Sequence, residues 1–136
     1  MISYKHNLKV FYRDIDSMGI VYYSRYFEFF EEARTELLNS IGMNITSIEK
    51  NGIFLPVISA HCDYKKGLKL QQNFTIETII LEIPKVILKI NYKIYIENRA
   101  NYIVKGYTEH AFTKINGKPT RAPDFIIRLI KKHWSL

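Results

Sequence analysis

The feature that most limits the fold of this chain is a change in apolar periodicity near residue 42. Before it, Tyr23 to Ile41 place apolar side chains three and four positions apart with charged residues between them, which predicts one long helix. Gly42 follows at a position where helices commonly end in glycine. Beyond it, apolar stretches typical of strands occupy residues 54–62, 74–83, 86–96 and 102–115. One long helix followed by successive strands predicts an α+β domain, with the helix packed on a largely antiparallel sheet.

The two ends of the chain complete this order of elements. Lys5 to Arg13 alternate loosely between apolar and polar residues, which predicts a first strand and brings the sheet to five. Pro123 and Asp124 open a short terminal helix, because proline is tolerated in a first turn and an acid complements the helix dipole. With 136 residues and neither a repeat nor a linker-like stretch, the chain is expected to form a single domain over residues 1–136.

Composition narrows the class of protein. Apolar residues make up 47% of the chain, including ten Tyr and eight Phe, which excludes a disordered chain. No apolar stretch approaches the roughly 18 residues of a membrane span, and Met1 to Asn7 lacks the apolar centre of a signal peptide. Cys62 is the one cysteine, so an internal disulfide cannot form and a reducing compartment fits best. We therefore expect a soluble, cytoplasmic protein without a membrane span.

The chain is basic, since 20 Lys and Arg residues exceed 13 Asp and Glu residues and give a net charge of +7. This excess fits nucleic acid, an anionic membrane surface or a polyanionic ligand such as a phosphorylated cofactor. The basic residues are spread along the chain without a helix-turn-helix pattern or an RNP-type strand, so no nucleic-acid partner is expected. No metal site is expected either, because the histidines lack the close spacing of metal ligands: they are His6, His61, His110 and His133.

The residues best suited to chemistry lie between the first strand and the long helix. Asp14 and Asp16 stand two positions apart, followed by Gly19 and then by the predicted helix start. A carboxylate near a helix N-terminus is stabilised by the dipole and by backbone N–H groups that have no partner within the helix. The same N–H groups can hold the oxyanion that develops on a carbonyl under attack. One short segment could thus supply a nucleophile or base and its oxyanion hole; the alternative is that both acids only cap the helix.

This segment and the helix after it resemble a known family. The pattern D-x-D-x-x-G-h-V-x-x-x-x-Y, in which h is apolar, is followed by an A-R pair on the helix, and the matching residues are 14–23, Tyr26, Ala33, Arg34 and Gly42. It resembles the 4-hydroxybenzoyl-CoA thioesterase family of hotdog-fold proteins, which includes small acyl-CoA thioesterases associated with bacterial Tol–Pal clusters. The resemblance implies a five-stranded antiparallel sheet wrapped around one long helix, with a short C-terminal helix. It also implies acyl-CoA hydrolysis without a cofactor, since CoA is part of the substrate.

The resemblance assigns roles to two residues of the segment. The catalytic carboxylate falls on Asp16, which in the family acts as nucleophile on the thioester carbonyl or as base for water. The oxyanion donor falls on the backbone N–H of Tyr23 at the start of the helix. The Tol–Pal-linked branch typically has histidine at this position, so no side-chain role is expected of Tyr23. Asp14 is expected to be a structural turn or capping residue.

Candidate substrate-binding residues follow from the same resemblance. Basic residues in the turn after the third strand and in the C-terminal segment often meet the CoA phosphates, which points to Lys85 and Arg121. Lys65 and Lys66 are further candidates, at a corner that looks like the family's D-Y-K/R-x-P corner but lacks its proline and the Gly-Asp pair that follows. His61 is the one histidine expected near the pocket.

The resemblance also implies partners. A hotdog pocket is completed by a second subunit, so a homodimer or homotetramer is expected. Two other functions stay open: an acyl-carrier-protein thioesterase, because an acidic carrier also suits a charge of +7, and a non-hydrolytic acyl-thioester-binding or scaffold protein that keeps the fold.

Overall fold

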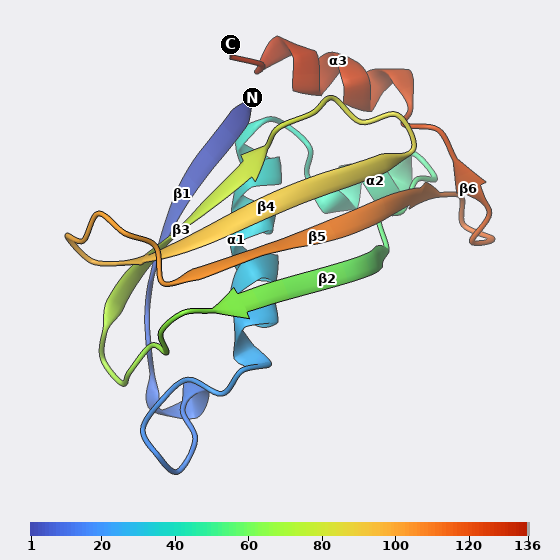
Figure 1. Cartoon of the computed structure of the whole chain (residues 1–136). Coiled ribbons are helices and arrows are strands. Elements are labelled where there is room, and N and C mark those ends of the chain that lie inside the picture. The colour runs from blue at the N-terminus through green and yellow to red at the C-terminus, as the bar shows by residue number, and fades with distance from the viewer. Residues whose placement is uncertain (136) are drawn as a thin grey trace.

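The computed structural model describes residues 1–135, which form an α+β domain with one long helix against an antiparallel sheet (Figure 1). The predicted fold class is confirmed. The elements in chain order are β1 (Ile2–Lys9), the 3-10 helix η1 (Tyr12–Asp14), α1 (Arg25–Ser40), α2 (Ile45–Lys50), β2 (Val57–Tyr64), β3 (Asn73–Ile80), β4 (Ile87–Ile96), β5 (Val104–Thr113), β6 (Pro119–Thr120) and α3 (Asp124–Lys132).

The sheet has the strand order β1-β3-β4-β5-β2, and each neighbouring pair is antiparallel. The two-residue strand β6 pairs with the end of β5. Strands β1 and β2 therefore form the two edges, and α1 lies along the inner face between them (Figure 1). No helix among residues 1–135 has both the length and the apolar character needed to cross a membrane.

The core lies between α1 and the inner face of the sheet. Strand β4 buries its predicted apolar face, which consists of Leu88, Ile90, Tyr92, Ile94 and Ile96. The Phe30 ring of α1 stacks on Tyr92, with ring centroids 4.2 Å apart and planes 9° apart. A Cβ atom at Gly106 of β5 would lie 2.8 Å from the Phe30 ring and 2.5 Å from the carbonyl oxygen of His61. The stack therefore occupies the space that a side chain at position 106 would need.

A chain of polar side chains is buried beside this stack. The Tyr92 hydroxyl is 2.6 Å from the Thr108 hydroxyl, which is 2.9 Å from Nε2 of His110. The other ring nitrogen, Nδ1, is 3.1 Å from the carbonyl oxygen of Leu55. A carbonyl can only accept, so Nδ1 donates to Leu55, and in the neutral ring Nε2 then accepts from the Thr108 hydroxyl. Burial of the ring accordingly lowers the pKa of His110, and the nearby Arg34 lowers it further.

Several boundaries differ from the predicted ones. Strand β1 starts earlier and ends at Lys9, because the chain then leaves the sheet and forms η1. Helix α1 begins at Arg25, so Tyr23 lies two residues before it instead of in its first turn. The strand predicted for residues 54–62 is shifted to β2, and the one predicted for 74–83 ends at Ile80.

Two short elements have no counterpart in the sequence analysis, namely α2 and β6. Helix α2 starts where the Asn44 side chain accepts hydrogen bonds from the N–H groups of Thr46, at 2.8 Å, and Ser47, at 3.4 Å. This is the usual way in which asparagine caps a helix. The turn predicted at Asn116-Gly117 is confirmed, since Gly117 has a φ of 82° and precedes β6.

We expect Gly106→Ala to lower the free energy of unfolding by about 2 kcal/mol, because the added methyl group overpacks the Phe30–Tyr92 stack. Urea denaturation measures this loss. Gly67→Ala is the matched control, since its Cβ would meet no atom closer than 3.9 Å. Equal stability of the two variants would contradict the packing argument.

The lowered pKa of His110 makes stability dependent on pH. As pH falls below about 6.5, the unfolded chain takes up a proton at this position that the folded protein binds less readily, so the free energy of unfolding decreases. Replacing His110 by Gln should flatten this dependence, as measured by urea denaturation at pH 7.5 and pH 5.5. An unchanged slope in the variant would show that other groups cause the effect.

Candidate active site

Asp16 lies at the base of a tight hairpin between η1 and α1. Its backbone N–H donates to the carbonyl oxygen of Ile20 at 2.9 Å, and Gly19 turns the chain with a φ of 78°. Its carboxylate oxygen Oδ1 accepts the N–H groups of Met18, at 2.8 Å, and Ile20, at 3.4 Å. The other oxygen, Oδ2, has no hydrogen-bond donor within residues 1–135, and the side chain is half-buried. The N–H groups of the hairpin thus orient Asp16 and leave one carboxylate oxygen available.

Asp14 has a different environment, with only 2% of its surface exposed. Its carboxylate accepts the Phe11 N–H at 2.9 Å and binds Arg25 through Nε at 3.1 Å and Nη2 at 2.5 Å. Its backbone carbonyl accepts the N–H of Tyr22 at 3.0 Å. Arg25 also pairs with Glu28 in the first turn of α1. Asp14 therefore ties η1 to the start of α1, which agrees with the structural role expected of it.

Tyr23 lies on the arm of the loop that returns to α1. Its backbone N–H has no acceptor among the residues that the structure describes, and its side chain is exposed. Its carbonyl oxygen accepts a hydrogen bond of 2.9 Å from the Tyr64 hydroxyl. One loop thus carries both an available carboxylate oxygen and an available N–H group. No role was predicted for Tyr64, which directly precedes Lys65 in the corner after β2.

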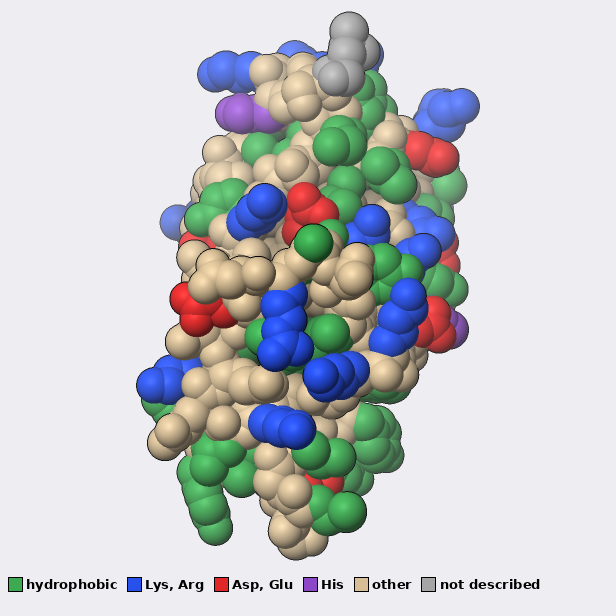
Figure 2. All heavy atoms as spheres, turned by 60° about the vertical axis from the view of Figure 1, so that its left-hand side comes forward, with side chains coloured by type: hydrophobic (Ala, Val, Ile, Leu, Met, Phe, Trp, Pro, Cys, Tyr) green, Lys and Arg blue, Asp and Glu red, His purple; other side chains and the backbone are tan. Residues whose placement is uncertain are grey.

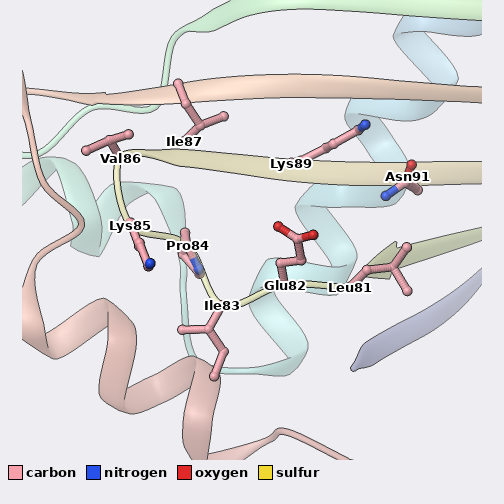
Figure 3. A pocket seen from close by; sticks show the side chains of 9 residues that line it. All are labelled: Leu81, Glu82, Ile83, Pro84, Lys85, Val86, Ile87, Lys89 and Asn91. Atoms are coloured by element: carbon pink, nitrogen blue, oxygen red, sulfur yellow. The ribbon is translucent and has the colours of Figure 1, made fainter.

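Lys85 and Arg121, the first pair of predicted phosphate ligands, come together at one end of the sheet. The backbone N–H of Ala122 donates to the carbonyl oxygen of Lys85 at 2.7 Å, so the two basic residues lie on adjacent segments, and both are exposed. Lys85 and Glu82 line a pocket of about 490 Å³ formed by the β3–β4 connection and the start of β4 (Figure 3).

Lys65 and Lys66, the second pair, lie at the opposite end of the sheet, because the corner after β2 is next to the start of β5. The Lys65 amino group is 4.2 Å from the centre of the Tyr102 ring. Figure 2 shows several Lys and Arg side chains close together on one face of the molecule, with acidic side chains nearby. The four predicted basic residues thus form two pairs at opposite ends of the sheet, Lys85 with Arg121 and Lys65 with Lys66.

His61 lies on β2, next to Tyr107 of β5. Its ring stacks on Tyr107 at 5.4 Å, and Nε2 is 3.1 Å from Asp63. Both neighbouring positions on β5, Gly106 and Thr108, are buried towards α1, so Tyr107 and His61 point to the outer face of the sheet. His61 is on the face away from α1, and its role in substrate binding stays a prediction.

Comparisons with known proteins identify the family of the chain. A family model described as the thioesterase-like superfamily matches residues 10–130. The chain belongs to this superfamily. The predicted family resemblance is thereby confirmed, and so is the hotdog fold.

Individual members of the thioesterase-like superfamily align over most of the chain. The acyl-CoA thioesterase YbgC of Helicobacter pylori is 30% identical over 129 residues, which cover 91% of this chain and 94% of that protein. DHNA-CoA thioesterase from Staphylococcus aureus has a structure similar to this one, with a TM-score of 0.87 and 26% identity over 97% of this chain and 91% of that chain. A variant of 4-hydroxybenzoyl-CoA thioesterase complexed with 4-hydroxybenzoyl-CoA gives a TM-score of 0.85 over 95% of this chain and 99% of that chain. At 17% identity, this last similarity shows the fold alone.

Within residues 1–135, no three His, Cys, Asp or Glu side chains are grouped so as to hold a metal ion.

We expect Asp14→Asn to lower the free energy of unfolding by about 2 kcal/mol, because it removes the charge of a buried carboxylate that binds Arg25. Urea denaturation measures the loss, and the exposed Asp63, changed to Asn, is the control. A variant that keeps its stability but loses thioester hydrolysis would instead give Asp14 a chemical role.

Proposed function

We propose that this chain is a cytoplasmic acyl-CoA thioesterase, which hydrolyses an acyl-CoA to a free acid and CoA. The observation that carries the proposal is the loop before α1, where the Asp16 carboxylate and the Tyr23 N–H each have hydrogen-bonding capacity that no described residue uses. Membership of the thioesterase-like superfamily supports a thioester hydrolase. The names of relatives such as the acyl-CoA thioesterase of Helicobacter pylori point to CoA esters.

Asp16 can act in either of two ways. As a nucleophile, its available oxygen attacks the thioester carbonyl carbon, the C–S bond breaks, and CoA leaves as a thiolate. Water then hydrolyses the acyl–aspartyl anhydride and restores the carboxylate. As a general base, Asp16 takes a proton from the water that attacks the carbonyl, and this proton passes to the departing sulfur. Both routes need an oriented carboxylate, and the N–H groups of Met18 and Ile20 hold one oxygen of Asp16 in place.

In both routes negative charge develops on the carbonyl oxygen of the substrate. The N–H of Tyr23 would donate to this oxygen, and a donor fixed before the reaction costs no reorganisation as the charge appears. The donor is a backbone group, so the presence of tyrosine where related proteins have histidine does not remove it.

The two pairs of basic residues are the proposed phosphate contacts of CoA. Lys85 and Arg121 are adjacent and exposed beside the pocket of the β3–β4 connection. Lys65 and Lys66 lie beyond the end of β2. A net charge of +7 also favours an acidic acyl carrier protein, which is the second candidate source of the thioester.

A second copy of the chain is the proposed partner. Strand β2 pairs with β5 on one side and is an edge of the sheet on the other. Its exposed residues include Val57, Ile58 and Ala60. An exposed, partly apolar edge strand favours pairing with another chain, which supports a homodimer or homotetramer.

We expect Asp16→Asn to lower kcat for acyl-CoA hydrolysis at least about 100-fold, because it removes the nucleophile or base. Steady-state assays with short, long and aromatic acyl-CoAs measure the effect, with an acyl carrier protein thioester assayed in parallel. Circular dichroism and binding of free CoA should match those of the wild type. Unchanged turnover in the variant would refute the mechanism. A wild-type protein that cleaves no thioester would favour the alternative of a non-hydrolytic acyl-thioester-binding or scaffold protein.

A further inference from the structure

Tyr64 connects the sheet to the proposed active site through one hydrogen bond. It is the last residue of β2, and its hydroxyl donates to the carbonyl oxygen of Tyr23 at 2.9 Å, across 41 positions of sequence. No other donor within residues 1–135 binds this carbonyl. The orientation of the Tyr23 carbonyl therefore depends on a side chain from a distant strand.

The Tyr64 ring is itself held in place. It packs edge-on against Tyr26, with ring centroids 5.0 Å apart and planes 73° apart. Tyr26 is buried, and its hydroxyl accepts the N–H of Leu68 at 3.0 Å. Partial burial raises the pKa of Tyr64, and the neighbouring Cys62 raises it further, so the hydroxyl keeps its proton. Tyr64 is thus a permanent donor on a fixed ring.

The turn that presents the Tyr23 N–H is fixed at three points. The N–H of Tyr22 donates to the carbonyl of Asp14 at 3.0 Å, and the Tyr22 carbonyl accepts the N–H of Arg25 at 2.9 Å. The Tyr64 hydroxyl adds the third bond, on the Tyr23 carbonyl. A trans peptide is planar, so a bond to this oxygen also fixes the direction of the Ser24 N–H on the far side of the same peptide group. The Tyr23 N–H belongs to the preceding peptide group, whose Tyr22 carbonyl is held by the Arg25 N–H. The Tyr64 bond therefore acts on it through the adjoining Tyr23–Ser24 peptide, which could otherwise rotate and loosen the turn.

We propose that Tyr64 is a positioning residue, whose hydroxyl fixes the Tyr23–Ser24 peptide and so keeps rigid the turn of residues 22–25, which presents the Tyr23 N–H to the thioester oxygen in the transition state. The inference rests on the proposed function. It deepens that function by adding a residue that acts through the backbone of the turn and not on the reacting atoms. An N–H group contributes most when the oxygen carries full negative charge, so a displaced donor costs more in kcat than in substrate affinity.

Tyr64→Phe tests this role, because it removes the hydroxyl and keeps the ring that packs on Tyr26. We expect kcat to fall about tenfold while KM changes less than about twofold. Binding of a non-hydrolysable thioether analogue of the substrate, the melting temperature and the shape of the pH–rate profile should stay as in the wild type. Tyr95→Phe is the matched control, since Tyr95 lies on β4 beside Ile94 and Ile96, which are buried, and so points to the outer face of the sheet.

Each other result counts against the inference. Unchanged kcat in Tyr64→Phe would show that the hydrogen bond does not position the turn. A lower melting temperature or an equal loss in analogue binding would make the hydroxyl structural, and loss of one limb of the pH–rate profile would make it an acid. Loss of activity in Asp16→Asn together with normal Tyr64→Phe would overturn the inference alone. Activity that persists in Asp16→Asn would overturn the proposed function.

Discussion

The structure depends on one constraint: the centre of the inner face of the sheet has to be covered by one long helix, α1. Helix α1 packs aromatic rings against the sheet, and the Phe30 ring stacks on Tyr92 of β4. Gly106 is the complementary feature of β5, because the ring occupies the volume of its missing side chain. Any change that lifts α1 from the sheet would also move the loop attached to its first turn. The packing of α1 in the core therefore determines the position of the candidate site.

The two acids of the loop show how similar groups acquire different uses. Asp14 is buried, and both of its carboxylate oxygens accept hydrogen bonds, one from the Phe11 N–H and the other from the Arg25 side chain. Asp16 is half-buried and uses one oxygen, so the other can meet a substrate or water. Sequence spacing alone does not distinguish the two residues, because both lie between a strand and a helix. The distinction comes from which of them faces Arg25.

The elements with a long periodic pattern were predictable from the sequence. Helix α1 and strand β4 each repeat one pattern over ten or more residues, so local side-chain chemistry determines them. The short elements η1, α2 and β6 have too few residues to show a period. The catalytic role of Asp16 is a prediction from a family motif, and the N–H groups that bind its carboxylate come from its own hairpin rather than from the helix start. Tyr64 was not identified, since its role follows from a tertiary contact that no local pattern encodes.

The contacts of the loop also determine when it can form. The bonds from Tyr64 to Tyr23 and from Leu68 to Tyr26 join residues that are 41 and 42 positions apart, whereas α1 needs only neighbours along the chain. Closing such long segments costs more entropy than winding a helix, so it belongs to the later part of folding. A chain that has formed α1 but has not docked the corner after β2 would hold a helix without an organised reaction site. Local opening of the corner after β2 would then disorganise the proposed reaction site and abolish its activity, while α1 stays folded.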